Sequence, residues 1–298
     1  MSKKTDKRAA MLDALHGLRW PVRSRVAAAA PGAQRSRKRG SSGEFTEYRL
    51  YRQGDDPRSL DWRLLARSDR AFVRVTDERA LLVTWLLLDA SASMNFPIVT
   101  GNGTSKWDQA SAMAVGLAAV VHAGGDPVGL IVSGGGRIIR IPPRSRRGAV
   151  QEMAQALDSV SCGGGDQMDK ALSMLSPNTR IVCISDWLGN LKDTMRAASV
   201  LARAGAQIDA VHIVAQEELE PPAGTHRVED PEPAGGGPAA AADLVLSRQE
   251  HKLYTQNFAA FRKTAREGWQ RLGAGYTEVL TSDDAARMVR AIVTGSRA

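Results

Sequence analysis

The chain contains one almost unbroken apolar run, Leu81 to Leu88, with the sequence L-L-V-T-W-L-L-L. A strand with one exposed face alternates apolar and polar residues, whereas a strand buried on both faces is apolar almost throughout. Strands of the second kind belong to mostly parallel sheets that helices cover on both faces. The run therefore predicts a central strand of an α/β sheet.

Polar side chains follow this strand directly, in the sequence D-A-S-A-S that begins at Asp89. Ligands of open α/β sheets bind beyond the carboxyl ends of the strands, and divalent cations such as Mg2+ prefer oxygen ligands. The carboxylate of Asp89 and the hydroxyls of Ser91 and Ser93 fit part of such a cation site. The same residue types are common at helix N-caps, so the motif by itself fits a capping turn equally well.

The composition is that of an ordinary soluble globular protein, with 43% hydrophobic and 24% charged residues among 298. Two cysteines, Cys162 and Cys183, make neither a disulfide framework nor a Cys-rich zinc motif and favour a reducing compartment. No apolar segment of a signal peptide follows the charged sequence M-S-K-K-T-D-K-R. The run Leu81 to Leu88 is also far shorter than the roughly 20 residues of a membrane-spanning helix. We therefore expect a cytoplasmic protein.

Positive charge is concentrated before the apolar run. Residues 1–80 carry 19 Lys and Arg against 10 Asp and Glu, whereas the remaining residues carry 21 against 22. A basic flank of this kind binds nucleic acid, anionic lipid or an acidic protein, or is simply a solvated face. Few aromatic residues lie among the basic ones, which disfavours stacking on nucleic-acid bases.

Residues 1–43 predict a small basic N-terminal segment that is partly helical or flexible. Within residues 5–30 the spacing of apolar residues predicts two short helices, broken at Trp20-Pro21. The sequence R-S-R-K-R-G-S-S-G, Arg35 to Gly43, predicts a connector, with a phosphate-binding tail as the alternative.

Residues 44–79 predict a strand, a turn at 54–57, a short helix and a second strand. Charged and aromatic residues are mixed densely in this segment, which indicates specific ion pairs. We expect the segment to be an integral part of the following domain, with Trp62 buried against its core.

Residues 80–298 alternate strand and helix patterns, which predicts a doubly wound α/β domain. The predicted strands are 81–88, 127–133, 137–141, 179–184, 207–214 and 275–280. The predicted helices are 106–123, 147–159, 167–175, 191–204, 250–272 and 283–294. Gly134 to Gly136 favour a hairpin turn over a phosphate cradle, because no G-x-x-x-x-G-K-[ST] is present. Residues 217–242 are rich in Pro, Ala, Gly and Glu and predict an excursion with little core.

A second buried strand, 179–184, is followed by Ser185-Asp186-Trp187 and so delivers another carboxylate to the same edge of the sheet. Asp166 precedes a predicted helix, where it either caps that helix or contributes a further carboxylate. Trp187 and Met94 are next to the polar residues in sequence. An exposed Trp187 would suit a protein contact, and core packing is the alternative for both.

The motifs Y-R-Q-G-D-D-P-R-S-L-D-W-R-L-L-A-R-S, F-V-R-V-T-D-E-R and L-L-L-D-A-S-A-S-M occur in this order over residues 48–94. Together they resemble the bacterial domain of unknown function 58 (DUF58) family. The resemblance runs from about Arg39 to Ala298. It implies a core similar to the von Willebrand factor A domain, a Rossmann-like doubly wound, mostly parallel sheet with helices on both faces.

The resemblance also implies a metal-ion-dependent adhesion site for Mg2+ or Mn2+. Its ligands would be Asp89, Ser91 and Ser93, which match the D-x-S-x-S motif of such sites, and Asp186, which matches the aspartate of their third loop. Where the family has a threonine in a second loop, this sequence has Gly165, so one hydroxyl ligand is missing. Water or the neighbouring Asp166 would take its place.

Coordination of a cation by such residues predicts binding rather than catalysis. The sequence has no G-x-S-x-G elbow, no H-E-x-x-H, and five histidines without a visible base partner. The resemblance implies a non-enzymatic protein-interaction module. It would work with a MoxR-type AAA+ ATPase or its client in chaperone-like maturation of protein complexes, with Trp187 at the contact. The alternatives are a nucleic-acid-binding protein acting through residues 1–43 and a metal-dependent phosphohydrolase.

Overall fold

The chain forms two compact units, one of residues 1–23 with 82–298 and one of residues 24–81. A computed structural model describes residues 3–21, 44–53, 60–68, 70–77, 81–97, 103–221, 225–229, 241–245 and 247–295. We describe each unit by itself.

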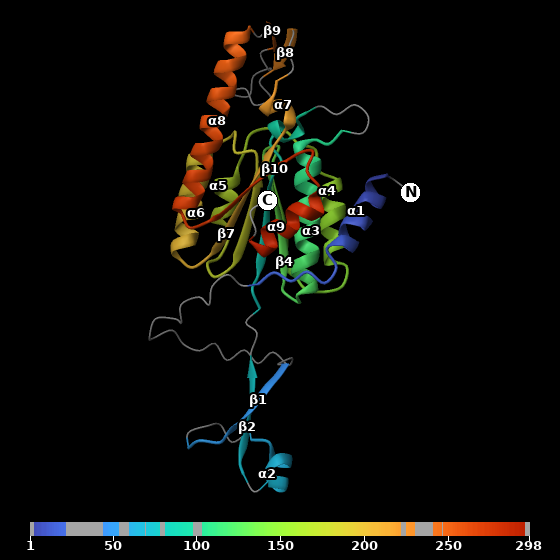
Figure 1. Cartoon of the computed structure of the whole chain (residues 1–298), viewed down its shortest axis with the longest axis vertical. Helices are drawn as coiled ribbons and strands as arrows, with labels where there is room; N and C mark the ends of the chain where they lie inside the picture. Colours follow the sequence, from blue (N-terminus) through green and yellow to red (C-terminus); the bar gives the residue numbers. More distant parts are fainter. Residues whose placement is uncertain are drawn as a thin grey trace. The chain divides into compact units, whose positions relative to one another are not determined.

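A six-stranded sheet forms the centre of the larger unit (Figure 1). Its strands lie in the order β10-β7-β6-β3-β4-β5, and neighbouring strands are parallel except for β4 and β5. Their bounds are β3 (Thr84–Asp89), β4 (Val128–Gly134), β5 (Arg137–Arg144), β6 (Arg180–Ser185), β7 (Gln207–Val214) and β10 (Gly275–Leu280). The mostly parallel sheet predicted from the sequence is confirmed.

Strand β3 lies in the middle of this sheet, as its apolar sequence predicts, and all six of its residues are buried. The strand begins at Thr84, whereas Leu81 at the start of the apolar run is exposed. The chain passes from β3 to β4 on one side and later returns to β6 on the other side. This reversal of strand order creates a switch point, where open α/β sheets bind ligands beyond the carboxyl ends of their strands.

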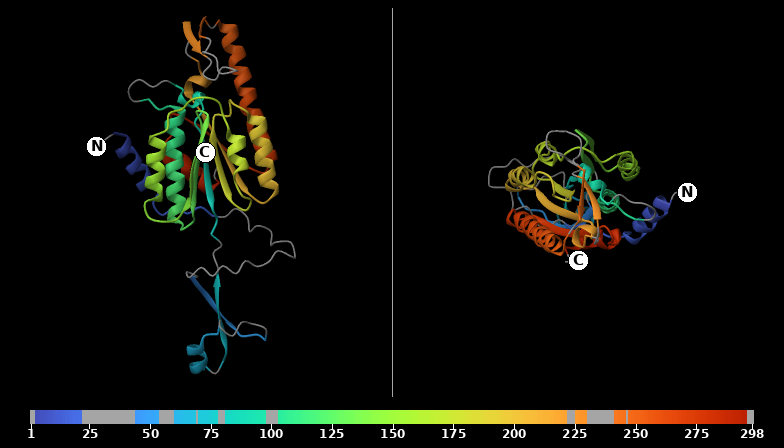
Figure 2. Two further views of the ribbon diagram at one scale, coloured as in Figure 1. Left: turned by 180° about the vertical axis from the view of Figure 1, so that it is seen from behind. Right: turned by 90° about the horizontal axis from the view of Figure 1, so that it is seen from above.

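Helices cover both faces of the sheet (Figure 2). One face carries α1 (Lys3–Ala14), α3 (Lys106–Ala123), α4 (Ala149–Asp158) and α9 (Ala285–Thr294). The other face carries α5 (Met168–Ser173), α6 (Leu191–Arg203) and α8 (Arg248–Arg271). Because successive strand residues point to opposite faces, Leu86 and Leu88 pack with the first set of helices and Trp85 and Leu87 with the second. The predicted doubly wound fold is confirmed.

Two long helices begin at capping boxes. Ser105 precedes α3, and its side chain accepts from the backbone N–H of Asp108 while the carboxylate of Asp108 accepts from Ser105. Ser247 and Glu250 make the same pair of contacts at the start of α8. A capping box satisfies backbone N–H groups that the first helical turn leaves unpaired, so these residues set where each helix begins.

The predicted hairpin is confirmed, because β4 and β5 pair in antiparallel register. Gly135 and Gly136, at its turn, have φ values of 61° and 75°, a conformation that glycine adopts without steric cost. The alternative, a phosphate cradle, is therefore not needed to explain these glycines.

The predicted excursion contains more regular structure than its composition suggested. It includes α7 (Gln216–Leu219) and an antiparallel hairpin of β8 (Thr225–Glu229) and β9 (Ala241–Val245). The composition of the segment, rich in alanine and proline, did not predict these strands. Their pairing depends on backbone contacts between residues that are well separated in the sequence.

The smaller unit contains an antiparallel pair, β1 (Glu44–Leu50) and β2 (Phe72–Asp77), and the helix α2 (Trp62–Ser68). These elements match the predicted ones, while the predicted turn at 54–57 lies outside the described residues. Residues 44–77 lie in the unit of residues 24–81. The expected burial of Trp62 was wrong, since its side chain is 63% exposed and none of the residues of α2 is buried.

Residues 3–21 belong to the larger unit. Met11 of α1 belongs to the main core. The guanidinium of Arg180, on β6, lies 4.3 Å from the ring of Trp20 and donates to the carbonyl oxygen of Pro21 at 3.0 Å. The second predicted helix and the basic connector lie outside the described residues. None of the helices that the structure describes has both the length and the hydropathy needed to cross a membrane.

Candidate functional site

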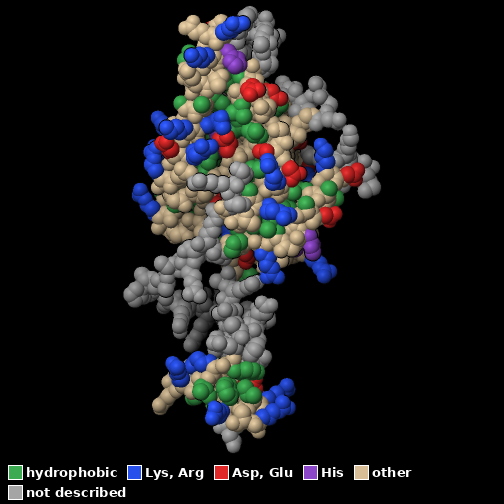
Figure 3. Space-filling model, in the orientation of Figure 1, with side chains coloured by type: hydrophobic (Ala, Val, Ile, Leu, Met, Phe, Trp, Pro, Cys, Tyr) green, Lys and Arg blue, Asp and Glu red, His purple; other side chains and the backbone are tan. Residues whose placement is uncertain are grey.

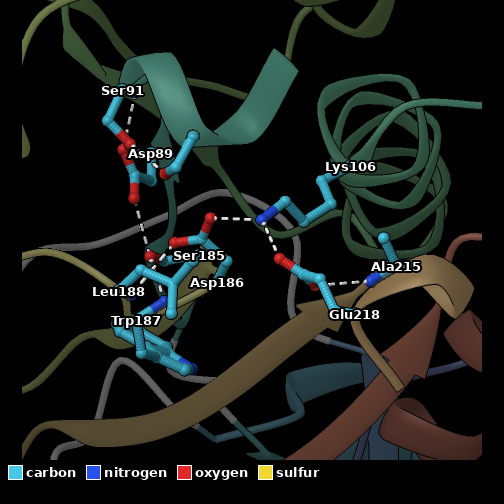
Figure 4. Close-up of polar contacts among 10 residues, drawn as sticks. Asp89, Ser91, Lys106, Ser185, Asp186, Trp187, Leu188, Ala215 and Glu218 are labelled. Carbon is cyan, nitrogen blue, oxygen red and sulfur yellow. Dashed lines mark hydrogen bonds and ion pairs between the residues drawn. The ribbon is translucent and has the colours of Figure 1, made fainter. Parts of the chain in front are cut away.

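The candidate site lies where β3, β4 and β6 end, which we call the carboxyl edge: Asp89–Asn95, Ser133, Ser185–Leu188 and α7. Asp89, the last residue of β3, is 1% exposed. Its Oδ1 accepts from the backbone N–H of Ser91 at 2.8 Å and its Oδ2 from the hydroxyl of Ser185 at 2.7 Å (Figure 4). Both donors are neutral, so these hydrogen bonds hold the Asp89 carboxyl group without neutralising its charge.

The two serines of the motif lie together beside Asp89. Ser91 precedes the short 3-10 helix η2 (Ala92–Asn95), and its Oγ is 3.2 Å from the Oγ of Ser93. Both residues are buried. The tight turn of η2 brings the hydroxyls to one place, so the structure groups the three residues of the motif as the sequence predicts.

Asp89 is also the middle member of a row of oxygen-bearing side chains across three strands. Ser133 of β4 is its partner in register, and Ser185 of β6 follows Ile184, the partner of Leu88. Residues paired across parallel strands share a face of the sheet, so the row runs along one face. Ser133 Oγ is buried without a hydrogen-bond partner, which is unusual for a buried polar atom.

Asp186 takes part in a buried network of opposite charges. Its Oδ2 accepts from the ammonium group of Lys106 at 2.7 Å, and the same ammonium group donates to Glu218 Oε1 at 2.6 Å. Asp186 Oδ1 accepts from the backbone N–H of Leu188 at 3.1 Å. Lys106 and Asp186 are each 1% exposed. Both carboxylate oxygens of Asp186 therefore have donors within the chain.

Asp89 has a strongly shifted pKa. Burial, together with the nearby carboxylates of Asp186 and Asp166, raises the pKa of Asp89 to about 8. Burial disfavours an ionised carboxyl group, and neighbouring negative charge disfavours it further. The hydrogen bonds from Ser185 and Ser91 oppose this rise but do not cancel it. Asp89 is thus a buried acid whose hydrogen-bond donors, in the part of the chain that the structure describes, are a neutral hydroxyl and a backbone N–H.

A glycine loop before α5 closes over the end of β3. In this loop, residues 163–165, the backbone N–H of Gly163 donates to the carbonyl oxygen of Ala90, and the carbonyl oxygen of Gly164 accepts from the backbone N–H of Ala92. The carbonyl oxygen of Gly163 also accepts from the backbone N–H of Gly135 in the β4–β5 turn. Gly165 has nothing within 4 Å of an added Cβ, so the place of the missing hydroxyl is open. Asp166 Oδ1 accepts from the backbone N–H of Met168, the first residue of α5, at 2.7 Å, while Gln167 occupies the N-cap position.

A model of the family described as Protein of unknown function DUF58 matches residues 47–237, more than half of the chain. The chain belongs to the DUF58 family. The family expected from the sequence motifs is therefore confirmed over that range.

Curated relatives of this DUF58 chain occur in mycobacteria. They include Uncharacterized protein Rv1480 of Mycobacterium tuberculosis and Uncharacterized protein Mb1516 of Mycobacterium bovis, each 31% identical over 193 residues. The matches cover 61% of this chain and 58% of each relative. The chain thus matches little more than half the length of these relatives.

Solved structures with a similar course of the chain have low sequence identity to it. BatB from Bacteroides thetaiotaomicron is 18% identical with a TM-score of 0.46, covering 72% of this chain and 98% of its own. The SpRpn10 VWA domain is 13% identical with a TM-score of 0.39, covering 72% of this chain and 95% of its own.

The DUF58 chain brings most of the predicted site residues to one edge. Asp89, Ser91 and Ser93 are in contact, and Asp186 lies next to Ser185, which bonds Asp89. Within the described ranges, no group of three or more His, Cys, Asp and Glu side chains is arranged to hold a metal ion.

The expected exposure of Trp187 was wrong. Its side chain is 2% exposed and packs against Trp269, with ring centroids 4.9 Å apart. Its backbone φ is 60°, and its side chain and that of Trp269 of α8 belong to one core cluster, against which Met195 of α6 packs. Met94 is fully buried, in agreement with core packing. Apolar side chains exposed at this edge are instead Leu188 and Phe96.

Sequence reasoning missed Lys106, Glu218, Ser133 and Ser185. One signal was available for Lys106, because it stands at the start of a helix that from Ala110 to Ala123 contains only Ser111 and His122 as polar residues. A lysine in a helix without a polar face is either at its exposed end or buried with a partner. No sequence pattern marks Glu218, Ser133 or Ser185, because their roles depend on which elements become neighbours in the fold.

Proposed function

We propose that this protein is a non-enzymatic protein-interaction module whose carboxyl edge binds Mg2+ or Mn2+ and contacts a partner through it. The observation that carries the proposal is the state of Asp89. It is a buried carboxyl group with neutral hydrogen-bond donors, two carboxylates nearby, and a pKa raised to about 8. A divalent cation bound at Asp89 would favour the ionised form of this carboxyl group and displace its proton.

The residues present fit such an ion. Asp89, Ser91 and Ser93 provide the oxygen atoms that magnesium and manganese prefer, and Asp186 would supply a second carboxylate. The buried hydroxyl of Ser133, which has no hydrogen-bond partner and shares a sheet face with Asp89, is a further oxygen donor. A bound Mg2+ or Mn2+ supplies positive charge and a coordination position for a carboxylate of the partner.

The partner proposed is a MoxR-type AAA+ ATPase or its client, as membership of the DUF58 family implies. Leu188 and Phe96 supply exposed apolar surface beside the proposed ion, and interfaces commonly combine an apolar patch with a few directed polar contacts. The two free cysteines fit the reducing cytoplasm, where we place this activity.

Manganese binding tests the metal part of the proposal. The electron paramagnetic resonance signal of free Mn2+ falls when the ion binds, so a titration gives the Kd directly. We expect saturable binding by the wild type and loss of binding in Asp89→Asn. Asp126→Asn is the matched control, because Asp126 lies before β4, at the opposite end of the strands, and asparagine can still accept from the Leu82 N–H. Binding that survives in Asp89→Asn would place the ion elsewhere.

A pull-down of the ATPase tests the partner part. We expect recovery in magnesium and loss in chelator, because without the ion a carboxylate of the partner would face the carboxyl groups of the edge. Asp89→Asn should behave in magnesium as the wild type does in chelator. Equal recovery under all conditions would contradict a contact through the metal.

A further inference from the structure

Lys106 places a positive charge inside the carboxyl edge. It is the first residue of α3 and is 1% exposed, and its ammonium group lies 5.6 Å from the centre of the Phe96 ring. The two bonds of this group, to Asp186 and Glu218, join residues that are 80 and 112 positions away in the sequence. One side chain thus connects the start of α3, the end of β6 and α7.

The ammonium group is held in its charged form. It lies 2.7 Å from the carboxylate of Asp186 and 2.6 Å from that of Glu218, and opposite charges this close favour the charged form. A buried charge is tolerated only when partners satisfy it. Lys106 therefore acts as a fixed cation for the two carboxylates.

The two strand-end carboxylates consequently differ. Asp186 receives a charged donor on Oδ2 and a backbone N–H on Oδ1, whereas Asp89 receives only neutral donors. A divalent cation bound by both would have to share Asp186 with the ammonium group or displace it. Two cations that need the same carboxylate oxygen repel each other across a poorly screened interior.

We infer that Lys106 is a built-in cation of the carboxyl edge that competes with the divalent ion for Asp186 and so weakens the binding of metal. The inference rests on the proposed metal site and names its regulation. Glu218 Oε2 also accepts from the backbone N–H of Ala215 at 2.8 Å. The competition for Asp186 therefore also involves α7, which carries Glu218. The competing explanation is a purely structural ion pair, which would affect stability but not metal affinity.

The substitution Lys106→Met tests the competition, since methionine keeps much of the volume of lysine and removes its charge. We expect the Kd for Mn2+, followed by the resonance signal of the free ion, to fall at least about tenfold, given the usual strength of close charge pairs. In chelator we expect a lower melting temperature than the wild type, because two buried carboxylates lose their cation. Added Mn2+ should raise the melting temperature of the variant more than that of the wild type.

Two further variants keep the test decisive. Lys106→Met combined with Glu218→Gln leaves a single carboxylate at Asp186, so it serves if the single variant does not fold. Lys192→Met is the matched control, because it removes an exposed lysine at the start of α6, which follows the same edge. We expect the control to bind Mn2+ as the wild type does.

Three results would contradict the inference, and they are distinguishable. An unchanged Kd with a lower melting temperature in Lys106→Met would show a structural ion pair, and would leave the proposed function intact. An equal gain of affinity in Lys192→Met would show a general effect of charge. Absence of Mn2+ binding in every protein, the wild type included, would contradict both the metal site and the competition.

Discussion

Two aspartates at neighbouring strand ends show how far identical residues differ when their surroundings differ. Asp186 is neutralised by Lys106 at 2.7 Å, whereas Asp89 is bonded by a hydroxyl and a backbone N–H. The desolvation of a buried charge is compensated only where an opposite charge is close. The same substitution at the two positions should therefore have different consequences.

In chelator, we expect Asp89→Asn to change the free energy of unfolding by less than about 1 kcal/mol, because asparagine preserves an acceptor for the Ser91 N–H and removes an uncompensated acid. Asp186→Asn should cost about 3–5 kcal/mol, since it breaks a buried ion pair and leaves the lysine with one partner. Urea denaturation of both variants measures the difference. Losses of equal size would mean that the two carboxyl groups are held in the same way.

His212 gives a prediction about pH. It lies on β7, 1% exposed, with its Nδ1 2.6 Å from the hydroxyl of Tyr276. Burial is the main cause that lowers its pKa from 6.5 to about 4, and the nearby carboxylates of Glu278 and Asp186 only partly oppose the shift. Between these two pH values the unfolded state binds a proton that the folded state does not, so stability falls as the pH falls.

The stability advantage of the wild type over His212→Asn should therefore shrink by about 3 kcal/mol between pH 6.5 and pH 4, and then level off. Taking the difference between the two proteins cancels the titration of the other groups. Urea denaturation at several pH values measures it. A difference that is independent of pH would contradict the neutral, buried state of the histidine.

Among the loops and strands, the glycine loop before α5 determines how the end of β3 is closed. Gly164 has a φ of 60°, and an added Cβ would lie 3.3 Å from the backbone of Gly135. Gly165 has neither constraint. An added Cβ there would have no neighbouring atom within 4 Å, and the φ of Gly165 is not in the left-handed region. Two adjacent glycines therefore differ in what they can accommodate.

We expect Gly165→Thr to fold with a stability close to that of the wild type and to bind Mn2+ more tightly, because it adds the hydroxyl that the site lacks. Gly164→Thr should lose about 1–3 kcal/mol, since a β-branched residue is strained at positive φ. Thermal unfolding compares the stabilities, and the manganese titration compares the affinities. An unchanged affinity in a well-folded Gly165→Thr would mean that this position is not beside the ion.

The whole chain is divided between the sheet unit and the smaller unit of residues 24–81. The surface of the molecule carries many charged side chains on the face seen in Figure 3. Trp62 is an exposed aromatic residue of the smaller unit, whereas Trp269 of α8 is fully buried in the core of the larger one. Large exposed aromatic residues are enriched in binding sites.

We expect Trp62→Ala to change stability by less than about 1 kcal/mol, as surface substitutions do. Trp269→Ala should cost about 3–5 kcal/mol, as the loss of a buried aromatic side chain does. Calorimetric or urea unfolding of the full chain measures both. A loss of several kcal/mol in Trp62→Ala would mean that the indole is buried in solution.

Much of the fold follows from local patterns. An apolar run long enough for one strand, followed by alternating helix and strand periodicities, leaves a doubly wound sheet as the natural arrangement, and the bounds of β7 and β10 coincide with the predicted segments. The grouping of Asp89, Ser91 and Ser93 was equally accessible, because three alternate residues after one strand end must lie close together.

Contacts between distant parts of the chain were not accessible in the same way. Trp62 and Trp187 have similar sequence contexts, yet one is exposed and the other buried, because burial depends on which elements pack around each residue. The pairing of Lys106 with Asp186 and Glu218 arises only when α3, β6 and α7 converge. Periodicity reports the environment of a residue along its own helix or strand, whereas the charge balance of a buried site is set by side chains that packing brings from elsewhere.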